Sequence, residues 1–407
     1  MRKHLASIIL LGLAGSAAAA DPFSARLTID NSSPVERGYT SIEDLLEQFS
    51  NERLQEVAPT YTPISAAVGE INLRGLSGVT LSYEQNSPVL DLRIASLGVH
   101  EQFNGATRDE SEDLLEEWFK GDGREVLTRL FNQLAELSPI DPVAGNPNSL
   151  MAKMVESDFA NATQLPQVVA KATDGDGPRN FVGISARMGQ YSQREFSSQV
   201  LSLPLSYTHL LEDRRYALVI DVPLTYVRNE GAKTYSGSLG VGLRLPAAER
   251  WSLVPALRVG AVGSPDLGSG GVIYSGSLTS HYAFEPLEKF NFAVADMLAY
   301  YSTGSVKVGD YDTGYDLSNT VLRNGLLVDR DAGFSLWGAP MQWDVQLVRT
   351  DYFGDALYSR YYHDLSVSLG TRKQAGALVW NALRVGLTYT NGDGDVRGAA
   401  FNLGYTF

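Results

Sequence analysis

From Asn180 to Phe407, hydrophobic and polar residues alternate with a period of two. In one segment every second residue is apolar: Leu201, Leu203, Leu205 and Tyr207. This is the period of a strand with one apolar and one polar face. The pattern recurs in about twelve segments, and most are long enough to cross a bilayer at a tilt, which takes about 9–11 residues. After three early segments, the candidate strands are 235–245, 251–261, 272–282, 290–300, 315–323, 343–347, 363–369, 379–389 and 396–407.

Alternation alone fits both a soluble sandwich and a membrane barrel, and two further patterns favour the barrel. Aromatic residues recur near strand ends at positions that share the apolar face of the strand, as at Tyr226 and Tyr235. Aromatic rings at such positions are typical of the headgroup level of a membrane. Most charges within strands fall on the opposite, polar face, and Asp296 is an exception. We therefore interpret 179–407 as a transmembrane antiparallel β-barrel, whose candidate lumen-lining charges are Arg187, Asp221, Arg244, Arg258, Asp344, Asp364 and Arg384.

The connections between these strands differ in length and composition. Short turns such as Pro246–Arg250 and Glu285–Lys289 are typical of a periplasmic end. Loops rich in Gly, Asp and Ser are typical of the outer end: 264–271, 302–314 and 391–395. Asn324–Pro340 is expected to be a long connection, and it falls on the wrong end for this scheme.

Residues 21–178 mix helix and strand signals. Thr40 or Ser41 can cap a short helix, and the region from Gly69 to His100 alternates like strands. Further helices are expected near 110–120, at 124–137 and from Ser149, and 172–178 is expected to be a linker. We therefore predict a small α/β domain, placed on the periplasmic side or in the lumen. Whether it plugs the lumen, caps the mouth or recruits another periplasmic envelope protein is left open.

The last strand carries its own pattern. Its apolar positions are Phe401, Leu403, Tyr405 and Phe407, and the sequence stops on the aromatic residue. This resembles the C-terminal signature of bacterial outer-membrane barrels, which implies outer-membrane lipid and the barrel-assembly machinery as partners.

With a helix from Ser149 to Ala160 before the linker, residues 149–407 resemble the translocator domain of autotransporters. In that family a helix through the pore leads into the first strand, and the barrel helps to bring an N-terminal passenger outside. Residues 21–148 depart from the family because they show no long repetitive β-helix pattern. The likeness is therefore to solitary autotransporter-type barrels without a large passenger, in a structural or secretion-related role.

The N-terminus and the composition narrow the class of protein. Residues 1–20 have the order of an export signal, with Arg2 and Lys3 before an apolar run and small residues at its end. Removing them takes two of the 33 basic residues and none of the 47 acidic ones, which leaves a net charge of −16. Clustered positive charge for nucleic-acid binding is therefore not expected. The absence of cysteine excludes disulfides and thiolate sites.

Two other functions compete with the autotransporter-like interpretation. The inward charges could line the channel of a small-solute porin, although pairing between them to fill a narrow barrel is favoured. An outer-membrane hydrolase would need a histidine, and His209 and His281 are candidates. No G-x-S-x-G or H-E-x-x-H motif is present, so the expectation is no enzyme, no catalytic or metal-binding residues and no cofactor. Asp174, Asp176, Asp393 and Asp395 are interpreted as solvated turns.

Overall fold

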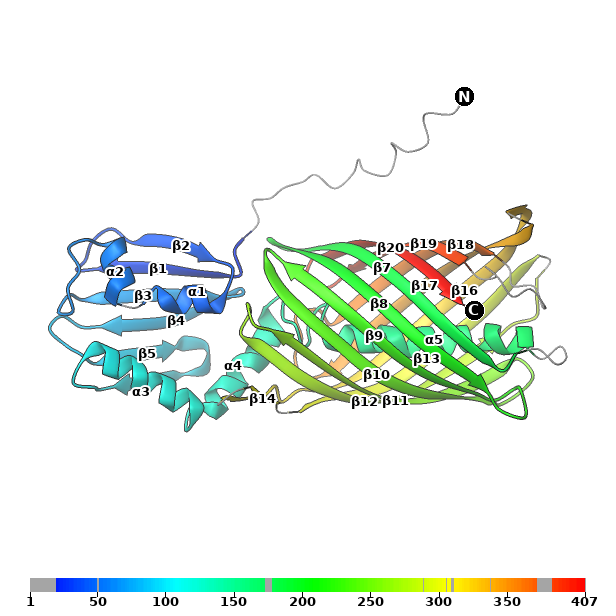
Figure 1. Cartoon of the computed structure of the whole chain (residues 1–407), viewed down its shortest axis with the longest axis horizontal. Coiled ribbons are helices and arrows are strands. Elements are labelled where there is room, and N and C mark those ends of the chain that lie inside the picture. Colours follow the sequence, from blue (N-terminus) through cyan, green and yellow to red (C-terminus); the bar gives the residue numbers. More distant parts are fainter. Residues whose placement is uncertain are drawn as a thin grey trace, which may run out of the picture.

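The computed structural model describes residues 20–49, 51–172, 178–287, 289–304, 306–308, 311–336, 338–371 and 383–406. Residues 1–19 of the expected signal segment 1–20 and the terminal Phe407 lie outside this range. Figure 1 shows a smaller domain beside one end of a long barrel. The predicted fold class is confirmed: the chain is mainly β, with a closed barrel of 12 antiparallel strands after an N-terminal sheet with helices.

The N-terminal domain is a six-stranded antiparallel sheet in the order β2-β1-β3-β4-β5-β6. Its strands are β1 Phe23–Ile29, β2 Val35–Tyr39, β3 Ala67–Leu73, β4 Leu76–Tyr83, β5 Leu90–Ile94 and β6 Val99–Phe103. Its helices are α1 Ile42–Glu47, α2 Asn51–Val57, the short η1 Ala95–Leu97, α3 Arg108–Lys120 and α4 Arg124–Leu137. Ser41 caps α1 by accepting a hydrogen bond from the Asp44 amide at 3.0 Å.

One face of this sheet forms a core. Alternate residues of β1 and β5 are buried, among them Phe23, Leu27 and Leu92, and they belong to apolar clusters that also include helix residues. The apolar stripe of α4 packs partly on the barrel, because the ring of Phe131 stacks on that of Tyr315 at 5.3 Å between centroids. Helix α4 therefore joins the two parts of the molecule.

The barrel closes where β20 pairs with β7. Its strands are β7 Asn180–Gln193, β8 Phe196–Leu210, β9 Ala217–Asn229, β10 Ala232–Pro246, β11 Trp251–Ser264, β12 Ser269–Ala283, β13 Phe290–Gly304, β16 Ser318–Leu336, β17 Ala339–Gly354, β18 Tyr361–Thr371, β19 Leu383–Gly392 and β20 Val396–Thr406. β14 Val306–Val308 and β15 Tyr311–Thr313 form a separate small hairpin. Among the described residues, no helix is long and apolar enough to cross a membrane.

The long connection expected at 324–340 is wrong. β16 continues through it to Leu336, and β17 begins at Ala339. Asn324 and Gly325 interrupt the apolar alternation, but cross-strand pairing on both sides holds them in the sheet, with Asn324 opposite Asp296 and Arg349. Local sequence preference is weaker than a ladder of hydrogen bonds with two neighbouring strands. The expected strands 315–323 and 343–347 were accordingly too short.

The barrel has two distinct ends. At the terminal end, β7 begins and β20 finishes, and connections 211–216 and 247–250 lie there. At the domain end, hairpin connections lie at 194–195, 230–231, 265–268, 355–360 and 393–395. The N-terminal domain contacts the domain end, where the Ile42 amide donates to the Asp266 carbonyl at 2.8 Å and the Tyr358 amide donates to the Ala135 carbonyl at 2.9 Å.

Candidate functional site

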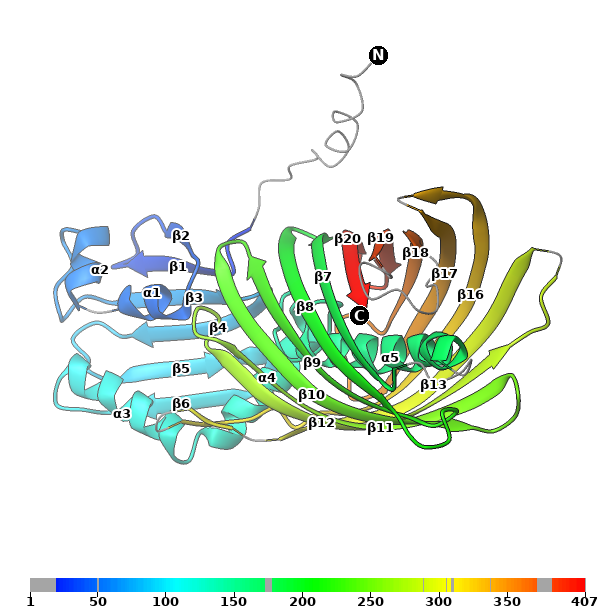
Figure 2. The same cartoon turned by 45° about the vertical axis from the view of Figure 1, so that its right-hand side comes forward.

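A helix occupies the lumen of the barrel. Helix α5, Leu150–Ala172, enters from the domain end and runs along the inside of the wall, where it packs against β9 to β13 (Figure 2). Ser149 precedes it and donates its hydroxyl to the Asn146 carbonyl at 2.7 Å. The residues between Ile140 and Met154 are all buried. The sequence predicted a helix from Ser149, and this helix is the feature that organises the lumen.

Glycines on the inner wall make room for the helix. A Cβ atom added at Gly260 would lie 2.7 Å from the Met154 sulfur, and one added at Gly325 would lie 2.7 Å from the Phe159 ring. These glycines lie on β11 and β16, so α5 approaches the wall closely at two separate strands. Any larger residue at either position would displace the helix or the wall.

The first polar cluster ties α5 to β11. The Arg258 Nε donates to the Asp158 carboxylate at 2.8 Å, and its Nη2 donates to the Asp221 carboxylate at 2.7 Å. The Tyr301 hydroxyl also donates to Asp158, at 3.0 Å, while Arg258 donates to the Ser238 hydroxyl at 3.0 Å. All of these side chains are buried. The two carboxylates and the hydroxyl around the Arg258 guanidinium compensate the cost of burying its charge.

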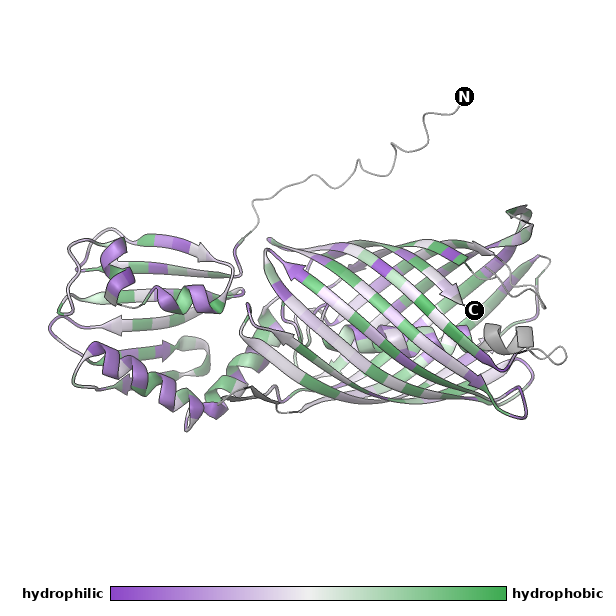
Figure 3. Ribbon diagram, in the orientation of Figure 1, coloured by the Kyte–Doolittle hydropathy of each residue, from purple (hydrophilic) through white to green (hydrophobic). Residues whose placement is uncertain are grey.

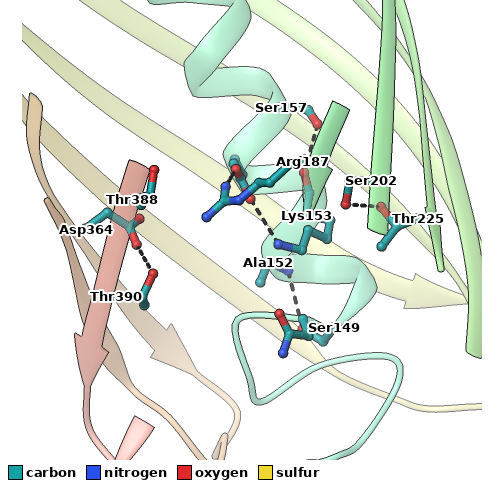
Figure 4. A network of polar contacts seen from close by, with 12 residues as sticks. Ser149, Ala152, Lys153, Ser157, Arg187, Ser202, Thr225, Asp364, Thr388 and Thr390 are labelled. Carbon is teal, nitrogen blue, oxygen red and sulfur yellow. Dashed lines mark hydrogen bonds and ion pairs between the residues drawn. The ribbon is translucent and has the colours of Figure 1, made fainter. Parts of the chain in front are cut away.

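The second cluster ties α5 to β7. The Arg187 guanidinium forms an ion pair with Glu156 of the helix and donates to the Tyr191 hydroxyl at 3.0 Å. Lys153, one helical turn before Glu156, donates to the same carboxylate at 3.2 Å and lies 5.8 Å from the centre of the Tyr191 ring. Figure 4 shows Lys153 and Arg187 close together inside the barrel, with Asp364 on the facing wall.

The remaining clusters lie on β16 to β19. Arg323 donates to the Asp364 carboxylate at 3.1 Å and lies 5.2 Å from the centre of the Phe159 ring of α5, while the Thr390 hydroxyl donates to Asp364 at 2.7 Å. Nearer the terminal end, Arg384 forms an ion pair with Asp344. The side chains of α5 thus reach three separate parts of the wall, on β7, β11 and β16.

All seven charges expected in the lumen are buried or half-buried on the inner parity of their strands. Six of them pair with an opposite charge. The seventh, Arg244, donates to the Arg215 backbone carbonyl. The sequence interpretation missed their partners Glu156, Asp158 and Arg323, and it also missed Lys153, which pairs with Glu156. A helix expected inside a polar lumen should itself carry charges, and that reasoning would have found Lys153, Glu156 and Asp158.

A buried cluster also holds the N-terminal domain to the barrel. The Tyr315 hydroxyl, from the connection before β16, donates to the Asp141 carboxylate at 2.7 Å. Arg74, from the turn between β3 and β4, donates to the same oxygen at 3.5 Å. Burial raises the pKa of Asp141, and the Arg74 charge and the Tyr315 hydrogen bond oppose that rise. We call Arg74, Asp141 and Tyr315 the seam cluster.

The histidines considered for catalysis lie apart. His209 is half-buried and hydrogen-bonds Asn180 at 2.7 Å, His281 is buried on the inner face of β12, and His363 lies on β18 near Arg349. His100 is in the N-terminal domain, 2.6 Å from Asp91. Within the described ranges, no group of three or more His, Cys, Asp or Glu residues could hold a metal ion. The Asp393 carboxylate accepts a hydrogen bond from Arg360 Nε at 3.2 Å. Asp174 and Asp176 lie outside the described residues.

The outer wall of the barrel is apolar. Large hydrophobic side chains on the outward parity are exposed, with Leu257 at 71% and Leu387 at 60% of their maximal accessible area. Figure 3 shows hydrophobic and hydrophilic residues alternating along the strands. Phe401 and Leu403 of the terminal signature also face outward and are exposed. Tyr405 is half-exposed, and Phe407 lies outside the described residues.

No protein-family model and no curated protein matches the sequence. Solved structures do match. The β-domain of the Bordetella autotransporter BrkA aligns at 14% identity and a TM-score of 0.44, covering 56% of this chain and 99% of that one. The translocator domain of the autotransporter NalP from Neisseria meningitidis aligns at 13% and 0.41, covering 63% and 97%. The KdgM porin in complex with disordered oligogalacturonate aligns at 10% and 0.34, covering 55% and 99%. These likenesses concern the fold alone.

Proposed function

We propose that this protein is an outer-membrane β-barrel that is closed by its own helix and carries its N-terminal domain at the outer end, in the manner of an autotransporter with a small passenger. The observation that carries the proposal is the course of α5. It connects a folded domain at the domain end with the first strand at the terminal end by passing through the lumen.

Membrane insertion is supported by the inverted distribution of side chains in the barrel. Exposed leucines, valines and tyrosines on the outside combine with buried, paired charges on the inside. In water this exposed apolar surface would be a strong driving force for aggregation, whereas hydrocarbon chains would cover it. Outer-membrane lipid and the barrel-assembly machinery are therefore the partners we propose.

The outward orientation of the domain end is supported by the loop pattern. The connections rich in Gly, Asp and Ser, at 264–271 and 391–395, belong to the domain end, and such loops are typical of the outer face. The sequence interpretation had placed the N-terminal domain on the periplasmic side or in the lumen. In the structure this domain contacts the same end as those loops, so we propose the outer side instead.

A channel function is disfavoured by the same helix. Side chains of α5 reach Arg258 on β11, Arg187 on β7 and Arg323 on β16, so the helix is bound on several sides of the lumen. We propose that the helix-filled barrel conducts little. An enzymatic role gains no support from the candidate His209, whose ring nitrogen hydrogen-bonds the Asn180 side chain at 2.7 Å.

Labelling with a membrane-impermeant maleimide tests this proposal, because the chain has no cysteine of its own. Gln85→Cys lies in an exposed turn of the N-terminal domain, and Glu249→Cys lies in an exposed turn at the terminal end. We expect intact cells to be labelled at position 85 and to be labelled at position 249 only after permeabilisation. Labelling with the two positions reversed, or only after permeabilisation at both, contradicts outward display.

A further inference from the structure

The outer wall changes abruptly from apolar to polar near the domain end. Across β20, β7, β8, β9 and β10, cross-strand pairing aligns one outward row of apolar residues: Phe401, Met188, Leu201, Tyr226 and Tyr235. The next outward row toward the domain end is Ala399, Gln190, Gln199, Arg228 and Lys233. Two residues along a strand span about 7 Å. The boundary between the two rows is therefore sharp, as the edge of a hydrocarbon layer is.

Two cations face each other in the second row. Arg228 and Lys233 are directly opposite in the β9–β10 pair, and both side chains are exposed. Like charges in this position repel each other. Within the described chain, no ion pair joins either cation to a carboxylate. The acidic residues of the adjacent turns are engaged with backbone amides: Glu230 accepts from Ser197 at 2.6 Å and Asp266 accepts from the Lys233 amide at 2.8 Å.

Three other surface arginines of the barrel each pair with a carboxylate. Arg349 lies 2.6 Å from Asp351 on the outer wall of β17. At the terminal end, Arg215 lies 2.7 Å from Asp213 and Arg250 lies 3.5 Å from Glu285. Arg228 and Lys233 have no such partner in the described chain and lie directly opposite each other, so an anion from outside the chain would remove the repulsion.

We propose that Gln190, Gln199, Arg228 and Lys233, the rim patch, bind the phosphate group of a lipid in the membrane leaflet at the domain end. A guanidinium, an ammonium and the two amide groups supply donors for phosphate oxygens. The rings of Tyr226 and Tyr235, 5.3 Å apart, lie one row deeper, where the glycerol region of that lipid would contact them. This inference rests on the proposed membrane location and not on which way the domain faces.

Lipid retention by the purified full chain tests the rim patch. Native mass spectrometry would compare phosphatidylglycerol with phosphatidylcholine bound to the wild type, to R228Q/K233Q and to R215Q/R250Q, which removes the same charge at the other end. The wild type and R215Q/R250Q should prefer the anionic lipid, and R228Q/K233Q should lower that preference roughly tenfold. Inorganic phosphate at the lipid concentration should not displace it.

Equal preference in all three proteins overturns the inference, and so does an equal loss in the two double variants. Displacement by inorganic phosphate overturns the choice of a lipid as the ligand. A gel shift between heated and unheated samples is the control for the barrel itself. If that shift is present in R228Q/K233Q, a changed lipid preference concerns the rim patch and not membrane insertion.

Discussion

The N-terminal sheet and the barrel are both antiparallel and share the same alternation of apolar and polar residues, yet their apolar faces have opposite environments. In the N-terminal domain Leu27 and Leu92 are buried beneath helices, and the polar face of the sheet is open. In the barrel Leu257 is exposed, whereas Arg258, its neighbour in sequence, is buried. A period of two therefore indicates strands but not which face is the core, and the polar face decides. Solvated Thr, Glu and Arg indicate a soluble sheet, and buried paired charges indicate a polar lumen.

The largest expected effect comes from truncating one leucine in each region. Leu92→Ala leaves a cavity in a packed core and should lower the free energy of unfolding of the N-terminal domain by about 2–5 kcal/mol. Leu257→Ala should have a much smaller effect on the barrel in lipid, because lipid chains fill the space. Denaturant unfolding of the full chain in bilayers, followed separately for domain and barrel, checks this. Equal losses at the two sites would mean that Leu257 is packed against protein.

The next effect concerns the contact between helix and wall. Asp158→Ala removes one of two carboxylates from buried Arg258, and we expect a loss of about 3 kcal/mol, at the low end for a broken buried pair because Asp221 remains. Asp158→Asn, which keeps a hydrogen-bond acceptor, is the milder control. Planar-bilayer recordings should show little conductance for the wild type and more for the alanine variant. Conductance that is high in the wild type and unaffected by Asp158→Ala would mean that α5 does not block the lumen.

The N-terminal domain should also respond to pH in a direction set by Glu112. Burial raises the pKa of this carboxyl to about 7, despite the Tyr83 hydroxyl that donates to it at 3.1 Å. A raised acid pKa favours the protonated folded form, so the domain should be most stable at acidic pH and lose stability as pH rises from about 4.5 to about 7. Glu112→Gln should remove this slope. Asp91→Asn is the control, and the slope should persist unchanged in it. Burial alone would raise the pKa of Asp91, but hydrogen bonds from Arg93, His100 and Gln102 outweigh burial and lower this pKa to about 2. Asp91 therefore titrates only in strong acid.

The smallest expected effect lies at the seam cluster. Tyr315→Phe removes one hydrogen bond to buried Asp141 and should weaken the attachment of the N-terminal domain by about 1–3 kcal/mol. Hydrogen exchange at α4 should then become faster, while exchange within β1 and β3 stays the same. Faster exchange throughout the N-terminal domain would instead indicate a general loss of its stability.

Much of the fold could be predicted from sequence because the alternation of apolar and polar residues is a local signal for strands and for their two faces. The charges at Asp221 and Arg258 indicated the inner face through parity alone, and Ser149 indicated the start of the lumen helix. The strand through Asn324 and Gly325 could not be predicted, because only pairing with β13 and β17 holds it in the sheet. The seam cluster was equally hidden. It joins Arg74, Asp141 and Tyr315, and sequence alone does not indicate a contact between residues 174 positions apart.

Thiol crosslinking between helix and wall tests most directly whether α5 fills the barrel. Met154→Cys combined with Gly260→Cys places two thiols where the Met154 sulfur approaches the inner wall, in a chain that has no other cysteine. Shortening residue 154 removes the sulfur that a side chain at position 260 would otherwise meet, so the helix keeps its place. The control pair combines Met154→Cys with Val259→Cys, which is one residue away and faces outward. We expect a short thiol–thiol crosslinker to join the first pair in native membranes and not the second. Failure of the first pair to crosslink, or equal crosslinking of both, would contradict a helix-filled lumen.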